Sequence, residues 1–333
     1  MQNLKKAALC VKISIADKKG GIIMITFKND CTDPFFNQAF EEYVFENYTD
    51  DDIFFLWQNR PAVIVGQNQN IYREVDFFEL EKRNIPVVRR MSGGGTVYHD
   101  LGNVNYTFVS DASENLCYDT FLNPVIKALR SLGLDAAKRG VCDIAVCGLK
   151  VSGSAQRTSK GRVLHHGTLL FSADLELLDK ITAKTKNESI VTKGTLSTVS
   201  AVTDISEHLK EKMSVEEFKS RLERAVLCGA KTAELSEKEL CEVKRLAKEK
   251  YQSDAWTFGK TPSFDFEKKG IFENRPIEVK YSAKRGFITE GYILCDFLCG
   301  GKGDLSGLSI AFENLKMISA ALCGDGRLVK YLI

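Results

Sequence analysis

The pattern of apolar positions alternates between short extended runs and amphipathic helices over the first three quarters of the chain. Residues 22–27 (IIMITF) are typical of a buried strand. Residues 33–48 place apolar side chains at helical spacing, with Asp33 as the N-cap and Pro34 at the first helical position. Further helices are predicted over residues 74–84, 118–133, 214–228 and 236–251. The last two begin with the capping-box pairs Ser214/Glu217 and Ser236/Glu239.

The predicted strands fall mostly into pairs joined by short polar turns. Residues 52–58 and 61–67 predict a hairpin-like unit, and residues 95–100 and 103–110 predict a second pair around the turn DLGN. Other strands are predicted over residues 85–90, over 142–157 with a turn at Cys147–Gly148, and over 162–172. Hairpins with helices inserted between them indicate an α+β fold with a mixed, mostly antiparallel sheet flanked by helices.

The texture of the sequence changes near Trp256, where a strand-rich meander begins and leads to a final helical pair. A chain of 333 residues is long enough for two units. We therefore predict a large domain over residues 22–253 and a small α+β domain over residues 254–333. The mildly basic residues 1–21 are predicted to be a disordered extension, which is either an organellar transit peptide or a stretch upstream of a start at Met24.

Composition narrows the functional class. The chain is 44% hydrophobic and 27% charged with a net charge of +2, so it has no basic field for bulk nucleic-acid binding. Its apolar stretches are too short to span a bilayer, and no secretory signal is recognisable. Ten dispersed cysteines without a C-x-x-C pair indicate reduced cytosolic thiols, and no dedicated metal site is expected.

The first candidate for chemistry is residues 89–108, RRMSGGGTVYHDLGNVNYTF. Three glycines permit positive φ and let backbone N–H groups approach an anion, yet the segment matches neither a Walker loop nor a dinucleotide fingerprint. Arg89 and Arg90 point to opposite faces of a strand, so one could bind an anion while the other is solvated or structural. His99 and Asp100 are expected to hold the turn by hydrogen bonds, because no nucleophile elbow accompanies them.

Two further segments carry candidate groups. Lys150 in GLKVSGSAQR (148–157) lies among small residues, where its compact charge could meet a phosphate or an oxyanion; a surface lysine is the alternative. LHHGTLLF (164–171) holds two adjacent histidines that face opposite ways in a strand. They cannot form a two-ligand metal site by themselves, but one of them could line a pocket.

Together, these three segments resemble the lipoate–protein ligase family in its long form with a C-terminal accessory domain. DPFFNQAFEEYVF, FFLWQNRPAVIVGQNQN and WTFGKTPSFDF support the resemblance, which runs from about residue 24 to the C-terminus. It implies a fold shared with biotin ligases. It also implies activation of lipoate with Mg-ATP to lipoyl-adenylate, followed by transfer to a lysine of an acceptor, either an E2 subunit of a 2-oxoacid dehydrogenase or the glycine-cleavage H protein.

The resemblance also implies roles for individual residues. Lys150 is the catalytic group and would contact both the lipoyl carbonyl and the phosphate. The nucleotide would be bound by Lys150 together with Arg90, Gly95, Thr96, Val97, Tyr98, Asn103 and Asp143. Lipoate would be bound by Lys150 together with Ser92, Gly93, Gly94 and His166. Mg²⁺ would arrive with ATP rather than at a dedicated site. The implied protein is a cytoplasmic monomer, or a mitochondrial one if the N-terminal extension is a transit peptide, and it contacts neither nucleic acid nor membrane.

One departure from the family pattern keeps alternatives open. Where bacterial ligases often carry an SVRSRVTN-like loop, this chain has KGTLSTVSAVTDI (193–205), without either arginine. One alternative is an amidotransferase that moves a lipoyl or octanoyl group through a cysteine thioester without ATP, with Cys142 as the candidate nucleophile and Cys147 nearby. The other alternative is a non-catalytic scaffold that binds lipoyl cargo.

Overall fold

The computed structural model describes residues 24–112, 117–182, 187–198, 200–227, 230–296, 298, 301–323 and 326–333. The extension predicted over residues 1–21 lies outside the described residues. Over the described ranges, no helix combines the length and the apolar character that a membrane span requires.

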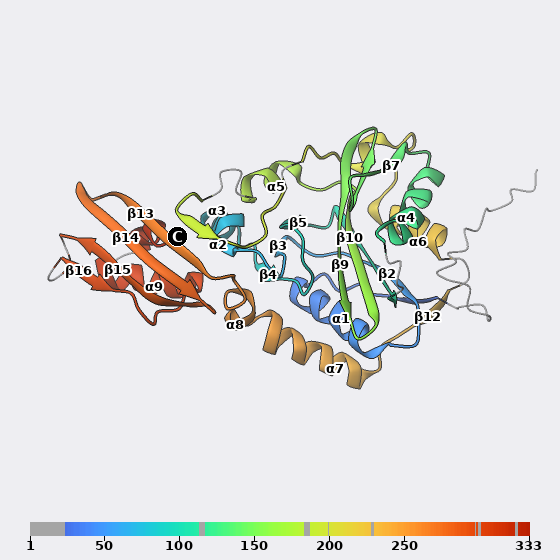
Figure 1. Cartoon of the computed structure of the whole chain (residues 1–333). Coiled ribbons are helices and arrows are strands. Elements are labelled where there is room, and N and C mark those ends of the chain that lie inside the picture. Colours follow the sequence, from blue (N-terminus) through green and yellow to red (C-terminus); the bar gives the residue numbers. More distant parts are fainter. Residues whose placement is uncertain are drawn as a thin grey trace, which may run out of the picture.

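An eight-stranded sheet dominates the larger part of the molecule, and its long strands β9 and β10 stand out in Figure 1. The strand order is β12-β1-β2-β6-β10-β9-β8-β7, with parallel pairing only between β12, β1 and β2. The strands span β1 Ile25–Phe27, β2 Ile53–Trp57, β6 Asn103–Asp111, β7 Ala136–Arg139, β8 Asp143–Val146, β9 Leu149–Ser159, β10 Arg162–Leu170 and β12 Lys231–Ala233. The predicted α+β class with a mostly antiparallel sheet is confirmed.

Helices cover both faces of this sheet. Successive side chains point to opposite faces, so Phe54 and Phe108 join the core beneath α4 (Asp119–Ser131) and α6 (Val215–Val226). Phe55 faces the other way, into the core formed with α1 (Pro34–Asn47) and α7 (Glu237–Leu246). The predicted cap of α1 is present, since the Asp33 carboxylate accepts hydrogen bonds from the N–H groups of Phe35 and Phe36.

Only one of the two predicted capping boxes is complete. Ser236 and Glu239 form a complete capping box at the start of α7. Ser214 accepts a hydrogen bond from the Glu217 N–H, but the Glu217 carboxylate forms an ion pair with Arg221 one turn further on. The box predicted at Ser214 is therefore only half formed.

A second, three-stranded sheet packs on the first and corrects both predicted hairpins. It has the order β4-β3-β5 and consists of β3 (Ala62–Val65), β4 (Val87–Arg89) and β5 (Val97–His99). Strand β2 pairs with β1 and β6, whereas β3 pairs with β4 and β5; β5 and β6 likewise lie in different sheets. The predicted pairing of residues 52–58 with 61–67 is wrong, and so is that of 95–100 with 103–110. A strand buried on both faces carries a continuous apolar run, which does not indicate its neighbours.

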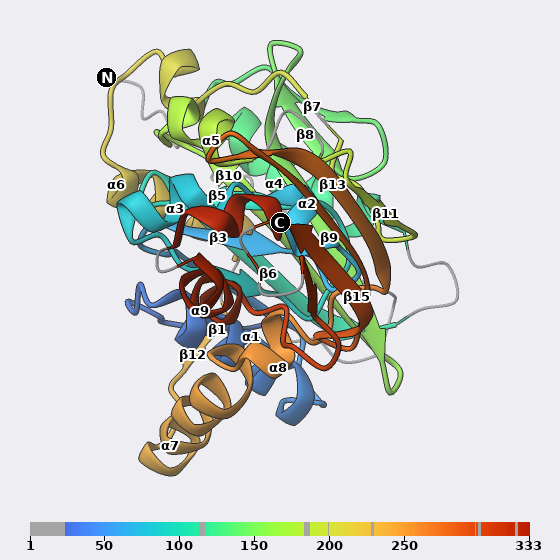
Figure 2. The same ribbon diagram turned by 90° about the vertical axis from the view of Figure 1, so that its left-hand side faces the viewer.

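A third sheet, of five strands in the order β11-β13-β14-β15-β16, lies at the left of Figure 1 and toward the viewer in Figure 2. It comprises β11 Ile190–Thr192, β13 Phe264–Phe272, β14 Arg275–Lys284, β15 Phe287–Cys295 and β16 Lys302–Asp304. Helix α9 (Phe312–Cys323) and the 3₁₀ helix Gly326–Tyr331 pack against it. The predicted meander corresponds to β13–β15. Strand β11 was not predicted and comes from the middle of the chain.

Short helices complete the chain. They are α2 Ile71–Glu74, α3 Phe77–Arg83, α5 Leu175–Ile181, the 3₁₀ helix Ile205–His208, the π-helical turn Ala247–Tyr251 and α8 Asp254–Thr257. Helix α2 follows the turn after β3, and α8 leads into the five-stranded sheet. Both lie close to the segment that carries the glycines.

A fully buried arginine connects these helices. The Arg89 guanidinium donates to the carbonyls of Gly66, Gln67 and Gln69 in the turn after β3. It also donates to the Thr257 carbonyl and the Thr261 hydroxyl beyond α8. One of the two neighbouring arginines was predicted to be either solvated or structural. Arg89 is that residue, and its role is structural.

Candidate active site

A cavity of about 390 Å³ opens between the eight-stranded and the three-stranded sheets. One wall comes from β6, β9 and β10, and the opposite wall comes from β3, β5 and the glycines before β5. Residues 195–198 roof it. A second cavity of about 160 Å³ shares part of the lining, including Thr96, Val97 and Lys150. The arrangement is therefore two adjoining compartments, and the shared residues lie at their junction.

Lys150 stands at that junction. It is the second residue of β9, just after the predicted tight turn, in which Cys147 and Gly148 have φ values of 50° and 80°. Its Nζ lies 3.0 Å from Asp143 Oδ1, and both side chains are largely buried. A Cβ on Gly153 would lie 3.2 Å from Lys150 Nζ, so a glycine there leaves room for the lysine side chain to lie along the strand.

Arg90 is hydrogen-bonded to the glycine loop that follows it. Its guanidinium donates to the carbonyls of Ile64 (3.1 Å), Gly93 (2.5 Å) and Gly95 (2.7 Å), and its Nε donates to the Ser92 hydroxyl (3.0 Å). Burial lowers the pKa of Arg90 to about 10, which still leaves it charged at neutral pH. The charge therefore fixes the shape of the glycine loop, while the side chain lines the larger cavity.

A close backbone approach extends the glycine pattern to a fourth residue. A Cβ at Gly66 would lie 2.2 Å from the carbonyl oxygen of Gly94, which itself has a φ of +85°. Only glycine at position 66 lets the loop rest against the end of β3. Sequence reasoning missed this requirement, although the glycine in VIVGQ was the available signal.

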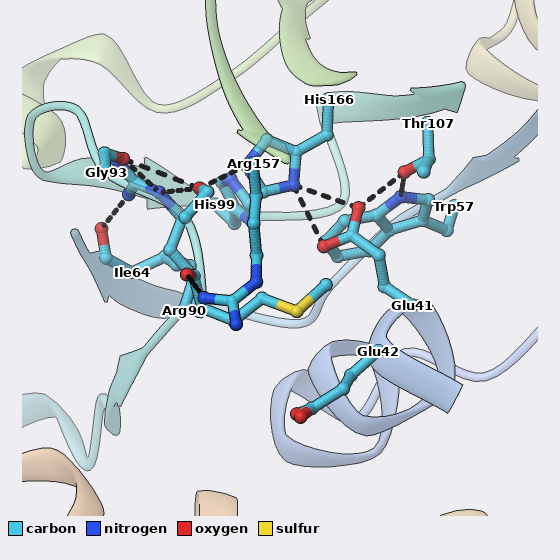
Figure 3. Close-up of polar contacts among 12 residues, drawn as sticks. Glu41, Glu42, Trp57, Ile64, Arg90, Gly93, His99, Thr107, Arg157 and His166 are labelled. Atoms are coloured by element: carbon cyan, nitrogen blue, oxygen red, sulfur yellow. Dashed lines mark hydrogen bonds and ion pairs between the residues drawn. The ribbon is translucent and has the colours of Figure 1, made fainter. Parts of the chain in front are cut away.

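A continuous network of hydrogen bonds includes the lining residues His166 and Trp57, and part of it is drawn in Figure 3. Ser92 Oγ lies 2.6 Å from His166 Nε2, and His166 Nδ1 lies 2.9 Å from both carboxylate oxygens of Glu41. Thr107 donates to Glu41 (2.6 Å) and accepts from Trp57 Nε1 (2.9 Å). In this network the Glu41 carboxylate accepts a hydrogen bond from the Nδ1–H of His166. The Nε2 of His166 therefore accepts a hydrogen bond from the Ser92 hydroxyl.

The connectivity Ser92–His166–Glu41 has the order of a catalytic triad, but its position excludes that role. The Ser92 side chain is almost completely buried and is held by Arg90, and Ser92 is not among the residues that line the two described cavities. These groups therefore position Arg90 and His166 rather than supply a nucleophile.

His99 lies at the inner end of the larger cavity. Asn37 Nδ2 donates to Asn59 Oδ1, so the amide of Asn59 donates to His99 Nδ1 at 3.0 Å. His99 Nε2 therefore carries the hydrogen. Burial, with Arg90 and His166 nearby, lowers the pKa of His99 to about 3, so the ring is neutral. The expected turn-holding role belongs to Asp100, whose carboxylate accepts from the Gly102 and Asp174 N–H groups.

The structure brings most of the predicted site residues together. The larger cavity is lined by Arg90, Gly94, Gly95, Thr96, Val97, Asp143, Lys150 and His166, and the smaller one includes Tyr98. Ser92 and Gly93 lie behind this lining and contact it through Arg90. Asn103 is fully buried and donates to Asn105 Oδ1 at 2.9 Å, so it contacts the cavity through that neighbour.

The segment without the family arginines is held over the site by a serine. Ser197 Oγ accepts hydrogen bonds from the Thr96 N–H (2.8 Å) and Gln69 Nε2 (3.0 Å), and it donates to the Glu74 carboxylate. Further along, Thr203 N donates to the Lys150 carbonyl. Glu74, Gln69 and Ser197 were all missed from sequence, because their contacts join positions more than a hundred residues apart.

Arg73 is another missed residue. It lines the smaller cavity from α2 and donates to the Ile190 carbonyl at 3.0 Å. Together with Lys150, it gives this compartment two cationic side chains.

Cys142 lines the larger cavity beside Asp143. Its Sγ lies 3.5 Å from Asp143 Oδ1, and burial together with that carboxylate raises the pKa of the thiol. A raised pKa keeps the thiol protonated and weakens it as a nucleophile.

Comparisons with known proteins agree with this geometry. A family model described as "Lipoyl protein ligase A/B catalytic domain" matches residues 33–227. Lipoate–protein ligase 1 of Staphylococcus aureus is 37% identical over 288 residues, which cover 85% of this chain and 87% of that protein. Lipoate-protein ligase LplJ of Bacillus subtilis is 37% identical over 291 residues, covering 85% and 86%.

Two solved structures share the fold. A lipoate-protein ligase A bound with ATP superposes with a TM-score of 0.57 at 25% identity, over 71% of this chain and 96% of that chain. The bi-partite lipoate protein ligase of Thermoplasma acidophilum, studied with its E2 lipoyl domain, gives a TM-score of 0.62 at 24% identity, also over 71% and 96%.

Proposed function

Because the chain belongs to the lipoate–protein ligase family, we propose that it joins lipoate to ATP as lipoyl-AMP, releases pyrophosphate, and passes the lipoyl group to a lysine of an acceptor protein. In the first step the lipoate carboxylate attacks the α-phosphorus and the bond to pyrophosphate breaks. In the second step the acceptor amine attacks the acyl carbonyl, the bond to AMP breaks, and the amine loses a proton.

The observation that carries the proposal is Lys150 at the junction of two compartments. An acyl chain in the larger cavity and a nucleoside in the smaller one would bring carboxylate and α-phosphate together beside Nζ. This chemistry needs positioned reactants and neutralised charge rather than a side-chain nucleophile. Lys150 supplies a partly buried cation at that point, with Asp143 at 3.0 Å to orient it.

The remaining predicted residues take supporting roles. The backbone from Gly95 to Val97, shaped by Arg90, faces the adenylate. Arg73 is the second cation available to the nucleotide. Mg²⁺ would accompany the triphosphate, and the carboxylates of Asp143 and Glu74, which line the cavities, are oxygen ligands of the kind it prefers.

The test is lipoate-dependent exchange of labelled pyrophosphate into ATP, measured for the wild type and Lys150→Ala. We expect exchange in the wild type and a loss of at least about 100-fold in the variant, because the cation that meets the developing charge is removed. Lys160→Ala is the matched control, since Lys160 lies at the far end of β9 with only a surface ion pair to Glu46. Undiminished exchange by Lys150→Ala would show that Lys150 is not catalytic.

The same assay separates the proposal from its alternatives. A thioester-forming transferase and a non-catalytic scaffold would both lack the exchange. Cys142→Ser should keep wild-type exchange and lipoyl transfer, because the raised pKa of Cys142 does not suit it as the nucleophile. Loss of transfer by Cys142→Ser, with no exchange in the wild type, would favour the transferase.

The acceptor is proposed from the relatives' chemistry. The Thermoplasma ligase is described with an E2 lipoyl domain, and we extend that partner class, together with the glycine-cleavage H protein, to this chain. The proposal also includes a cytoplasmic, monomeric enzyme that contacts neither nucleic acid nor membrane. It assigns catalysis to residues 22–253 and an accessory role to residues 254–333. Transfer of the lipoyl group to purified lipoyl domain, followed by mass spectrometry, tests the acceptor directly.

A further inference from the structure

We propose that His99 and Asn105 form a hydrogen-bonding subsite for the far end of the acyl group, which selects a sulfur-containing ring over a plain hydrocarbon. The inference rests on the proposed function, since it concerns the acid that occupies the larger cavity. It assigns a specificity role to two residues that sequence reasoning did not place in the site.

The observation behind it is a set of unsatisfied polar atoms at one end of the cavity. Across the described residues, His99 Nε2, Asn105 Nδ2 and Gln38 Oε1 are among the buried side-chain atoms without a hydrogen-bond partner. All three residues line the larger cavity, and each is at least nine-tenths buried. Buried polar groups normally find partners, so these atoms are available to whatever fills the space.

The hydrogen bonds that His99 and Asn105 already make show which of their groups remain to donate. His99 Nδ1 accepts from Asn59, which leaves Nε2–H directed elsewhere. Asn105 Oδ1 accepts from Asn103 Nδ2 at 2.9 Å, which leaves the Asn105 NH₂ group free to donate. Asn105 is directly opposite Trp57 in the sheet register, and the Trp57 and His99 ring centroids are 5.9 Å apart. Both donors therefore belong to residues that neighbour Trp57.

The other polar groups at this end have no capacity to spare. His166 uses one ring nitrogen with Ser92 and the other with Glu41. The Trp57 N–H is taken by Thr107. Donation of a hydrogen bond to a ligand atom at the inner end therefore falls to His99 and Asn105, since the free atom of Gln38 is an oxygen that can only accept.

The chemistry of the donors indicates which chain end they prefer. An alkyl terminus would displace water and leave two buried N–H groups unpaired, which is costly. A dithiolane ring carries sulfur lone pairs, which are weak acceptors of the kind a neutral N–H can meet. Because His99 is neutral, its N–H donates without bringing a buried charge. We therefore infer discrimination by hydrogen bonding in addition to shape.

The experiment compares three acids of the same chain length. They are lipoate, 5-cyclopentylpentanoate, which keeps the ring but lacks sulfur, and octanoate, which lacks both. Binding to the full-length wild-type protein is measured by calorimetry without ATP, and each acid is also assayed in pyrophosphate exchange. We expect lipoate to bind roughly tenfold or more tightly than 5-cyclopentylpentanoate. Equal affinity for these two acids would overturn the proposal.

Asn105→Leu provides the second arm. Leucine has a similar volume and no donor, so the preference for lipoate over 5-cyclopentylpentanoate should fall by several-fold, mainly through tighter binding of the carbon ring. Lys160→Ala is the control, because Lys160 lies outside both cavities and forms a surface ion pair with Glu46; it should keep the wild-type ratio. An unchanged ratio in folded Asn105→Leu would contradict the role of Asn105, and the wild-type comparison stands whether or not the variant folds. Absence of exchange with every acid would instead refute the proposed function.

Discussion

His165 faces away from the cavity into an aromatic cluster. Its ring lies 4.8 Å from Phe121 and 5.4 Å from Tyr118, measured between centroids, and its Nδ1 accepts from Gln156. Burial, with His166 beside it, lowers the pKa of His165 to about 3, as burial also does for His99. Both histidines are therefore neutral in the folded protein and become basic only on unfolding.

This predicts a stability that falls on acidification. An unfolded histidine has a pKa near 6.5, so between about pH 3 and 6.5 the unfolded chain binds more protons than the folded one. Stability contributed by each ring is present above pH 6.5 and is lost as pH falls through this window. From pH 7 to pH 5 the loss is at most about 2 kcal/mol for each histidine.

His165→Phe removes one of these groups while keeping an aromatic ring. Urea unfolding at pH 7 and pH 5 should show a smaller acid-induced loss of stability in this variant than in the wild type, by about half of the part due to the two histidines. Identical losses in the two proteins would show that His165 is charged when folded.

At the residue scale the sequence predicts the chemistry-bearing groups better than their partners. Lys150, the glycines and His166 are recognisable because each belongs to a short sequence motif. The Ile64 carbonyl that accepts from Arg90, and the Asn59 amide that sets the tautomer of His99, are brought close only in the folded chain. The sequence contains no local signal for such contacts.

At the element scale, the glycine loop and the end of β3 form one packed unit. Gly66→Ala places a methyl group 2.2 Å from the Gly94 oxygen. We expect a loss of about 2–3 kcal/mol in the free energy of unfolding, because a backbone atom cannot move aside as a side chain would.

Gly93→Ala is the matched comparison for that prediction. A Cβ there meets no atom within 4 Å, and Gly93 does not have a positive φ. Its stability should stay within about 0.5 kcal/mol of wild type in the same urea titration. If both substitutions cost the same, the contact between Gly66 and Gly94 is not what restricts position 66.

Helices and strands were predicted with different success for a physical reason. Helix α1 is indicated locally by its N-cap Asp33 and by Pro34 in the first turn. The turn before β9 is indicated by Gly148, a glycine that adopts positive φ without strain. The pairing of β2 and β3 depends on which distant strands they meet, and their continuously buried residues contain no alternation to indicate a face.

At the scale of the whole molecule, Arg89 connects the large sheet system to the five-stranded sheet. Arg89→Met would keep the approximate length of the side chain but remove the guanidinium hydrogen bonds to the carbonyls of Gly66, Gln69 and Thr257. We expect destabilisation of about 3–5 kcal/mol, together with faster proteolysis near residues 257–261. Thermal unfolding and limited proteolysis measure the two effects.

Arg83→Met is the control, because Arg83 lies on the surface of α3 and pairs only with Glu79 one turn away. It should leave both the unfolding temperature and the cleavage pattern near those of the wild type. Similar behaviour of the two variants would mean that Arg89 is not the connection.

The boundary predicted between residues 253 and 254 separates the sequence more cleanly than it separates the folded chain. Strand β11 belongs to the five-stranded sheet, yet its residues precede the boundary by some sixty positions. The pattern of apolar and polar residues could not predict that β11 belongs to this sheet, because a strand of three residues is too short to show a pattern.

That placement has a mechanical consequence. Strand β11 ends at Thr192, and the roof of the cavity begins at Thr195, where its N–H is bonded to the Asn68 carbonyl; the roof then reaches the pairing with Lys150 at Val202. Few residues along the chain therefore separate the five-stranded sheet from the contact with Lys150. If the five-stranded sheet moves, we expect the cavity lining at residues 195–198 and the contact with Lys150 to move with it, because the connecting segment is short.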